Sequence, residues 1–188
     1  QLSRYWIAES YYRNDQYRQA RELYAELYNQ SALYRQPESY LIPYNIAYCF
    51  YKEGDYDSAA RWFGAYLDGS VTDLRKDALE RVGDCHFVRK DYESAAETYD
   101  LVVRDFYNVN DIYPYYQAAL SYGLSRNGER KIKLLTNALS ADPASRFYPE
   151  ALYELGRAYV LREDDAKAEG VFHQLASTAK DTTFVAKA

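Results

Sequence analysis

Few residues in this sequence could carry out chemistry. Its 188 residues include two cysteines, two histidines and no methionine. Asp84, Cys85 and His86 are consecutive, and all three residue types bind metal ions in proteins. Consecutive residues of a helix point about 100° apart, so these three side chains cannot converge on one ion. We therefore expect His86 to be a core residue, and we predict no metal site.

The two cysteines occupy equivalent places in neighbouring copies of a helical pattern. Cys49 precedes Phe50, and Cys85 precedes His86. Equivalent positions on packed helices lie about 8–10 Å apart, which is beyond the reach of a disulfide, so we expect two reduced, buried thiols. The sequence also has no Walker loop, dinucleotide glycine motif, HExxH motif or serine elbow. We predict that this segment is not an enzyme and uses no cofactor.

Tyrosine is the unusual component of the sequence, with 23 Tyr against 7 Phe. A tyrosine can bury its ring while its hydroxyl stays in water, which suits half-exposed surfaces. The net charge is −5, and no run of Lys or Arg is present, so we predict no nucleic-acid partner. No apolar run approaches the ~20 residues that a membrane-spanning helix needs, so we predict no membrane span.

One phrase recurs along the chain. It reads NDQYRQARELY at 14–24, GDYDSAARWF at 54–63 and KDYESAAETY at 90–99. In each copy a tyrosine, an alanine three residues later and an aromatic residue four further on share one face of a helix. The alanine position recurs every 36 to 39 residues, with a degenerate fourth copy, as Ala20, Ala59, Ala95, Lys131 and Ala168. A fixed period of this length indicates stacked repeats.

A second helical pattern precedes each phrase. Its small-residue positions are Ala8, Ala47, Gly83, Ala119 and Gly156. A glycine inside a helix costs about 1 kcal/mol relative to alanine, so Gly83 and Gly156 indicate close helix–helix contacts. Each repeat is therefore a helical hairpin, with breaks at Gly54-Asp55 and Asn127-Gly128.

The predicted elements follow from this pattern. First helices are expected near 2–13, 41–52, 73–89, 112–125 and 147–162, and second helices near 17–30, 56–68, 92–106, 129–140 and 165–178. No linker or low-complexity segment divides the chain. We predict a single repeat domain, residues 1–188, of about five hairpins near 1–39, 40–71, 72–108, 111–143 and 146–180.

The pattern resembles the tetratricopeptide repeat family over almost the whole chain. The matching residues are Leu155, Gly156, Tyr159, Ala168 and Phe172 in the last copy, and Ile46, Ala47, Phe50, Gly54, Tyr56, Ala59 and Phe63 in the second. The repeats exceed the 34 residues usual for that family. The resemblance implies an all-α fold, a right-handed α-solenoid of stacked antiparallel helical hairpins, whose first helices line a concave face.

A stripe of tyrosines lies apart from the core face of the second repeat. Tyr44, Tyr48 and Tyr51 follow one another at spacings of four and three, whereas Ile46 and Cys49 belong to the core face. In the family resembled, these inner-helix places contact bound peptides. We therefore predict a non-catalytic protein–protein interaction module that binds a peptide or helix of a partner protein in a Tyr-rich concave groove. The predicted partner-binding residues are Tyr5, Tyr12, Tyr44, Tyr48, Tyr51, Tyr113 and Tyr116.

Two alternatives stay open for the tyrosines. They could serve as packing in a structural spacer or self-association surface, or they could capture a glycan or small ligand. The acids Asp77, Glu80 and Asp84 flank the stripe, and we expect them to form a solvated face.

A known variant of the family makes a further expectation possible. Chaperone-binding tetratricopeptide domains clamp the C-terminal carboxylate of a partner with Lys, Asn and Arg side chains. Asn45 and Arg81 match two of the five clamp positions, whereas Tyr5, Glu9 and Asp77 occupy the others. Acids at these positions repel a carboxylate, so we predict that this clamp is absent.

Both ends of the sequence indicate a fragment of a longer chain. The chain starts at Gln1 with a helical pattern already in progress, and residues 181–188 have the pattern of another helix beginning. Any targeting signal would then lie outside the fragment, so the compartment is not predicted from its ends. Long, aromatic-rich repeats are similar to the tetratricopeptide domains of bacterial cell-envelope proteins, which suggests the periplasm or cell envelope.

Overall fold

The fold is built entirely from helices in the part of the chain that the structure, a computed structural model, describes: residues 2–29, 37–69, 73–106 and 111–178. Ten α-helices and one short 3-10 helix lie in these ranges, and no strand does. The chain divides into two compact units, Gln1–Asp91 and Tyr92–Ala188, which we call the N-terminal and C-terminal units. The predicted single-domain organisation stays a prediction.

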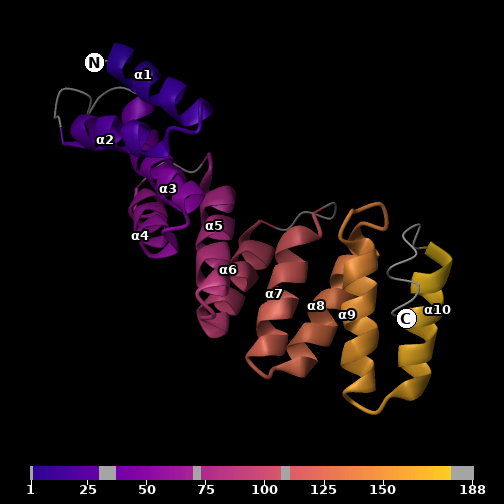
Figure 1. Cartoon of the computed structure of the whole chain (residues 1–188). Helices are drawn as coiled ribbons and strands as arrows, with labels where there is room; N and C mark the ends of the chain where they lie inside the picture. The colour runs from indigo at the N-terminus through magenta and orange to yellow at the C-terminus, as the bar shows by residue number, and fades with distance from the viewer. Residues whose placement is uncertain (1, 30–36, 70–72, 107–110, 179–188) are drawn as a thin grey trace. The chain divides into compact units, whose positions relative to one another are not determined.

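The N-terminal unit holds the first five α-helices (Figure 1). They are α1 (Leu2–Arg13), α2 (Tyr17–Tyr28), α3 (Ile42–Glu53), α4 (Tyr56–Leu67) and α5 (Arg75–Val88), with the 3-10 helix η2 (Pro37–Leu41) leading into α3. Each α-helix packs on the next one along the chain. This sequential packing is how helical hairpins bury their apolar faces against neighbours.

The C-terminal unit repeats the arrangement with five more helices. They are α6 (Tyr92–Asp105), α7 (Tyr113–Leu124), α8 (Gly128–Ala141), α9 (Tyr148–Val160) and α10 (Asp165–Thr178). Consecutive helices again pack on each other. The predicted helices are confirmed in both units, because no observed end differs from its predicted place by more than two residues. The 3-10 helix was not predicted, and residues 181–188 lie outside the described range.

The five turns between paired helices share one backbone conformation. One residue in each turn has a positive φ, and these residues are Asp15 (59°), Gly54 (82°), Lys90 (64°), Arg126 (66°) and Glu163 (58°). The following backbone N–H donates to the carbonyl five residues earlier, as from Asp55 to Phe50 at 3.0 Å. This is the left-handed ending that commonly terminates a helix, and only the second turn uses glycine for it.

The predicted break at Asn127-Gly128 is placed slightly differently. Arg126 takes the left-handed conformation, and Gly128 is the first residue of α8. Asn127 is the N-cap, and its Oδ1 accepts a hydrogen bond from the Arg130 N–H at 3.1 Å. Asp55 caps α4 in the same way, through the Ser58 N–H at 3.0 Å.

Small residues lie at the helix contacts, as the repeats predict. Ala8, Ala20, Ala47 and Ala59 are fully buried. A Cβ added at Gly156 would lie 2.5 Å from Cε1 of Phe172, so α9 and α10 meet at a contact that leaves no room for a methyl group. The contact predicted from Gly156 is therefore confirmed.

The degenerate fourth copy replaces a small residue with an ion pair. Lys131 lies over Gly123, where an added Cβ would approach the Lys131 Cδ to 2.8 Å. Its Nζ is 2.5 Å from Oε2 of Glu154 on α9, and the two side chains are only 12% and 14% exposed. The lysine stem thus fills the contact, and its charge is neutralised by the next hairpin.

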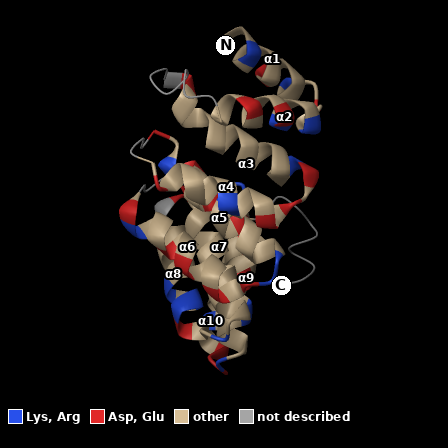
Figure 2. Ribbon diagram, turned by 90° about the vertical axis from the view of Figure 1, so that its left-hand side faces the viewer, with Lys and Arg blue, Asp and Glu red and all other residues tan. Residues whose placement is uncertain are grey.

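Charged residues of both signs occur on α1 and α2, as the red and blue segments of the ribbon show in Figure 2. Arg4 and Glu26 join these two helices at 3.2 Å. None of the described helices has the combination of length and apolar character needed to cross a bilayer.

Candidate functional site

A partly open pocket of about 250 Å³ lies between α1, α2 and α3 in the N-terminal unit. Its lining residues are Glu9, Tyr12, Tyr24, Tyr44, Asn45 and Tyr48. The wall is therefore mostly tyrosine rings, with one carboxylate and one amide among them. We call this the tyrosine pocket.

A hydrogen-bond network fixes the polar groups of the tyrosine pocket. Tyr24 on α2 donates its hydroxyl hydrogen to Oε1 of Glu9 at 2.5 Å. The Asn45 Nδ2 donates to the same oxygen at 2.9 Å and to the Tyr5 hydroxyl at 3.0 Å. Glu9 Oε1 thus joins all three helices.

Burial raises the pKa of the tyrosine hydroxyls in and beside the pocket. It raises the pKa of Tyr12 to about 12, with smaller contributions from neighbouring groups. The pKa of Tyr5 is also about 12, through burial first and the Glu9 charge second. Burial and hydrogen bonds to carboxylates raise the pKa of Tyr24 and Tyr48 further. At neutral pH these hydroxyls are hydrogen-bond donors.

The tyrosine stripe of α3 packs into the unit through its rings. The Tyr48 ring centroid lies 5.1 Å from that of Phe63, and Tyr44 lies 5.2 Å from Tyr66. Both hydroxyls donate to Oδ2 of Asp77 on α5, at 2.7 Å from Tyr44 and 2.5 Å from Tyr48. The rings of Tyr44 and Tyr48 thus contact α4 and their hydroxyls contact α5, so these two side chains hold the three helices together. The same two tyrosines also line the tyrosine pocket.

The acids beside this stripe do not form the solvated face that we expected. Glu80 and Asp84 are only 8% and 7% exposed. Asp84 accepts a hydrogen bond from Tyr51 at 3.1 Å and pairs with Arg81, which also lies 3.6 Å from both Asp77 and Glu80. The expectation was wrong because the sequence period did not show that the tyrosine hydroxyls and one arginine would cover these carboxylates.

The clamp-like residues are engaged within the unit. Asn45 donates to Glu9 and Tyr5, and Arg81 is shared among three acids. Tyr5, a predicted contact residue, is only 4% exposed, so its ring belongs to the core. Its hydroxyl oxygen accepts a hydrogen bond from Asn45 and helps to fix that side chain.

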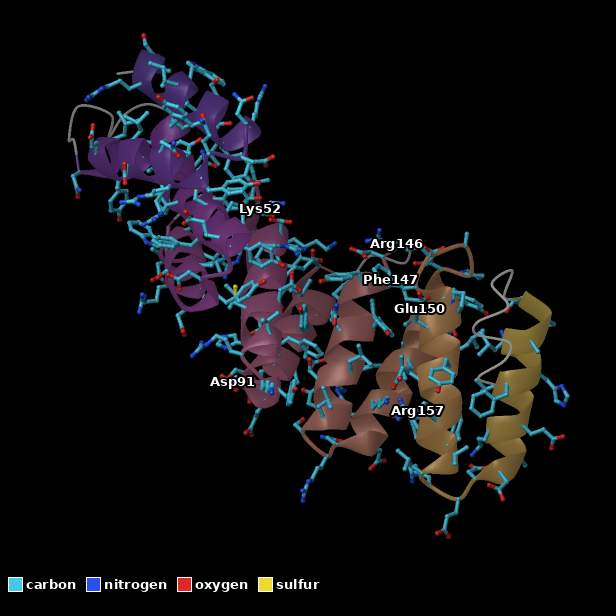
Figure 3. All side chains as sticks on the ribbon, viewed as in Figure 1. Lys52, Asp91, Arg146, Phe147, Glu150 and Arg157 are labelled. Carbon is cyan, nitrogen blue, oxygen red and sulfur yellow. The ribbon has the colours of Figure 1, made fainter. Side chains whose placement is uncertain are left out.

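The predicted residues of the C-terminal unit form a separate aromatic cluster. The rings of Tyr116 and Phe147 stack with centroids 5.7 Å apart, and Tyr113 lies 5.5 Å from Phe147. The Arg146 guanidinium lies 4.6 Å from the Phe147 centroid, and Figure 3 shows both residues with Glu150 at the start of α9. Burial raises the pKa of Tyr116 to about 12, with Glu154 and Glu150 adding to it. Both tyrosines are half-buried.

The two cysteines and His86, the residues that could carry out chemistry, lie in different surroundings. Cys49 and Cys85 are both free thiols that are fully buried, as predicted, and burial raises the pKa of each to about 12. His86 Nδ1 lies 3.2 Å from Asp91 Oδ2 in the adjacent turn. Within the described ranges, no group of three His, Cys, Asp or Glu side chains could hold a metal ion.

Comparison with known proteins identifies the repeats. Residues 5–73 and 150–182 match sequence models of the tetratricopeptide repeat. These two stretches are tetratricopeptide repeats, and the helical fold of both units is the fold of that family. None of the curated proteins matches it.

Several solved structures share this tetratricopeptide fold. MamA from Desulfovibrio magneticus RS-1 is 20% identical, with a TM-score of 0.73 over 92% of this chain and 90% of that one. YrrB is 16% identical, with a TM-score of 0.74 over 94% and 85%. Repeats of a kinesin light chain from Podosopora anserina are 14% identical, with a TM-score of 0.67 over 94% and 93%. At these identities the likeness shows the fold.

The tetratricopeptide pattern located some pocket residues and missed the role of others. Tyr12, Tyr44 and Tyr48 were predicted as contact residues and line the tyrosine pocket together. Glu9 was predicted as a position on the inner face beside Tyr5 and Tyr12 and as a clamp position, Asn45 as a clamp position, and Tyr24 as the aromatic residue of the first phrase. The hydrogen bonds from Tyr24 and Asn45 to Glu9 join residues that are 15 and 36 positions apart, and local spacing does not predict such contacts.

Proposed function

We propose that the chain is a non-catalytic protein–protein interaction module that binds a peptide segment of a partner in the tyrosine pocket. The observation that carries this proposal is an open pocket with tyrosine walls between three helices. Its volume of about 250 Å³ suits one large side chain with its backbone. This volume lies just below the range of about 300–1,000 Å³ that is typical of small-molecule pockets, so the glycan or small-ligand alternative stays open.

The chemistry of the walls supports peptide binding. Tyrosine gives a large contact area with few rotatable bonds, so it is enriched among the residues that dominate binding energy. Packing against Phe63 and hydrogen bonds to Asp77 hold Tyr44 and Tyr48 in place before a ligand arrives. A site that is already ordered loses less entropy on binding. YrrB, which has a similar fold, is described as a tetratricopeptide protein with an unusual peptide-binding site.

A displayed library of random peptides tests the proposal directly. Peptides would be selected on the immobilised chain, and their affinities measured against two variants. Tyr12→Ala removes one ring from the pocket wall, and Tyr28→Ala removes an exposed tyrosine of α2 that does not line the pocket. We expect Tyr12→Ala to weaken the selected peptides at least tenfold and Tyr28→Ala to leave them unchanged.

Two outcomes would contradict the proposal. One is a set of selected peptides that binds both variants equally well, and the other is a selection that yields no peptide above background. Tyr51, Tyr113 and Tyr116 stay proposed contacts of the same partner, and Tyr116→Ala extends the comparison to the C-terminal unit.

One observation favours the self-association alternative. Helix α1 exposes Leu2, Trp6 and Ile7, and Trp6 is 55% exposed. Sedimentation velocity over a range of concentrations distinguishes the two functions: self-association predicts a mass that rises with concentration and falls back in Trp6→Glu. The bacterial cell-envelope setting stays a prediction.

A further inference from the structure

The tyrosine pocket contains a carboxylate without a cationic partner. Glu9 accepts hydrogen bonds from Tyr24 and Asn45, both of which are neutral donors. None of the described Lys, Arg and His side chains forms an ion pair with Glu9. The pocket therefore combines tyrosine rings with an unneutralised negative charge.

Elsewhere the chain completes the same combination with its own arginine. In three places among the described residues, an arginine lies over a tyrosine ring and pairs with a carboxylate beside it. The centroid distances and pairs are Arg81 over Tyr51 at 5.9 Å with Asp84, Arg130 over Tyr122 at 5.9 Å with Asp100, and Arg157 over Tyr153 at 5.7 Å with Glu154. Figure 3 labels Arg157 on α9.

Two of these arrangements also match the pocket in their hydrogen bonding. Tyr51 donates to Asp84 at 3.1 Å and Tyr122 donates to Asp100 at 3.4 Å. In the tyrosine pocket Tyr24 donates to Glu9 in the same way, but no arginine is present among the described residues to complete it. The pocket thus has the tyrosine and the carboxylate of this recurring arrangement, but not the arginine.

A cation from outside would be stabilised there for two reasons. The faces of tyrosine rings attract a positive charge, and this attraction is strongest where water is excluded. A nearby carboxylate adds a charge-assisted hydrogen bond, which is about twice as strong as a neutral one. The space of about 250 Å³ is large enough for the side chain of either lysine or arginine.

We propose that the tyrosine pocket receives the side chain of a lysine or arginine from a partner peptide, with Glu9 as its counter-ion and the tyrosine rings as its walls. This inference rests on the proposed function, because it names the chemistry of the peptide bound at the same pocket. It also agrees with the net charge of −5, which attracts basic rather than acidic segments.

The test uses peptides from the library selection whose affinity depends on Tyr12. Each arginine in them is replaced in turn by citrulline and each lysine by norleucine, which remove the charge and keep the approximate shape. We expect one such replacement to lower the affinity at least tenfold. Glu9→Gln should weaken the parent peptide by a similar factor, and it should not weaken the neutral peptide further, because both changes remove the same interaction.

The Glu9→Gln variant keeps an oxygen that can accept from Tyr24 and Asn45, so its thermal unfolding should match that of the parent chain. Glu22→Gln is the matched control, since Glu22 lies exposed on α2 and pairs with Arg18. It changes the net charge equally and should leave peptide affinity within twofold.

The outcomes separate the two proposals. If peptides need Tyr12 but tolerate every neutral replacement, the pocket binds an apolar side chain: the cation inference is then wrong and the proposed function stands. If no peptide depends on Tyr12, both are wrong. Equal losses in Glu9→Gln and Glu22→Gln would also overturn the inference, because long-range charge would then explain them.

Discussion

The contact between Gly156 and Phe172 allows the packing of the last hairpin to be tested with one methyl group. In Gly156→Ala the new Cβ would meet Phe172 Cε1 at 2.5 Å, Cζ at 2.6 Å and Cδ1 at 3.0 Å. Carbon atoms prefer about 3.5–4.0 Å, so the ring must move by roughly 1 Å. Such overpacking typically costs about 1–3 kcal/mol, against about 1 kcal/mol gained from the better helix propensity of alanine. We expect a net loss of about 0–2 kcal/mol, toward the upper end of that range because three ring atoms are displaced at once.

Gly170→Ala is the matched control within the same hairpin. Gly170 lies inside α10, and an added Cβ would have no atom within 4 Å. This variant should gain about 0.5–1 kcal/mol from helix propensity. The two Gly→Ala substitutions are therefore expected to change the free energy of unfolding in opposite directions, although the added group is the same.

Thermal unfolding and amide hydrogen exchange measure both effects. A change of 1 kcal/mol shifts the Tm of a chain of this size by about 2–4 °C. Because repeat stability is a sum of local and neighbour contributions, the loss in Gly156→Ala should appear as faster exchange in α9 and α10. Phe172→Leu should recover part of it in the double variant. If Gly156→Ala and Gly170→Ala stabilise the chain equally, the packing argument is refuted.

Three further predictions concern the turns, the thiols and the phenols. Arg126→Gly should raise the urea midpoint by an amount equivalent to about 1 kcal/mol, because arginine pays for its φ of 66° and glycine does not, and an unchanged midpoint would contradict this. Cys49 and Cys85 should not react with Ellman's reagent in the native chain and should both react in denaturant, so a native reaction would contradict their burial. The pKa of Tyr5, Tyr12 and Tyr51 is about 12 in the folded chain, against 10 in an unfolded chain. The stability that these neutral phenols contribute to the fold is therefore fully present below pH 10 and is lost as the pH rises toward 12. Tyrosinate absorbance should therefore show delayed phenols that ionise together with alkaline unfolding, whereas a titration complete near pH 10 would contradict the prediction.

The sequence predicts the helices well because their signal is local and repeated. The tyrosine, alanine and aromatic residue of each phrase lie within one helix, and five copies reinforce the same period. The left-handed residue at Arg126 escaped notice because glycine is the usual signal for that conformation. In this chain the repeated carbonyl geometry of the turn imposes it on Asp15, Lys90, Arg126 and Glu163 as well.

The candidate site was predicted only in part because its polar contacts are not local. The spacing of Tyr44, Tyr48 and Tyr51 correctly separates them from Ile46 and Cys49, which are fully buried. Nothing in that spacing shows that Asp77, about 30 residues later, would accept hydrogen bonds from the hydroxyls of both Tyr44 and Tyr48. The assignment of the acids to solvent failed for this reason.

The ion pair between Lys131 and Glu154 has a consequence for how such a chain can change over evolution. Glu154 stands where the other repeats have Trp6, Asn45, Arg81 and Gln117, so only one neighbour supplies the acid that Lys131 needs. If the fourth repeat were copied or moved next to any other, the lysine would be buried without a partner. Gene duplication and recombination can therefore shuffle these repeats only by keeping the fourth and fifth together, and the order of the array is inherited as well as its parts.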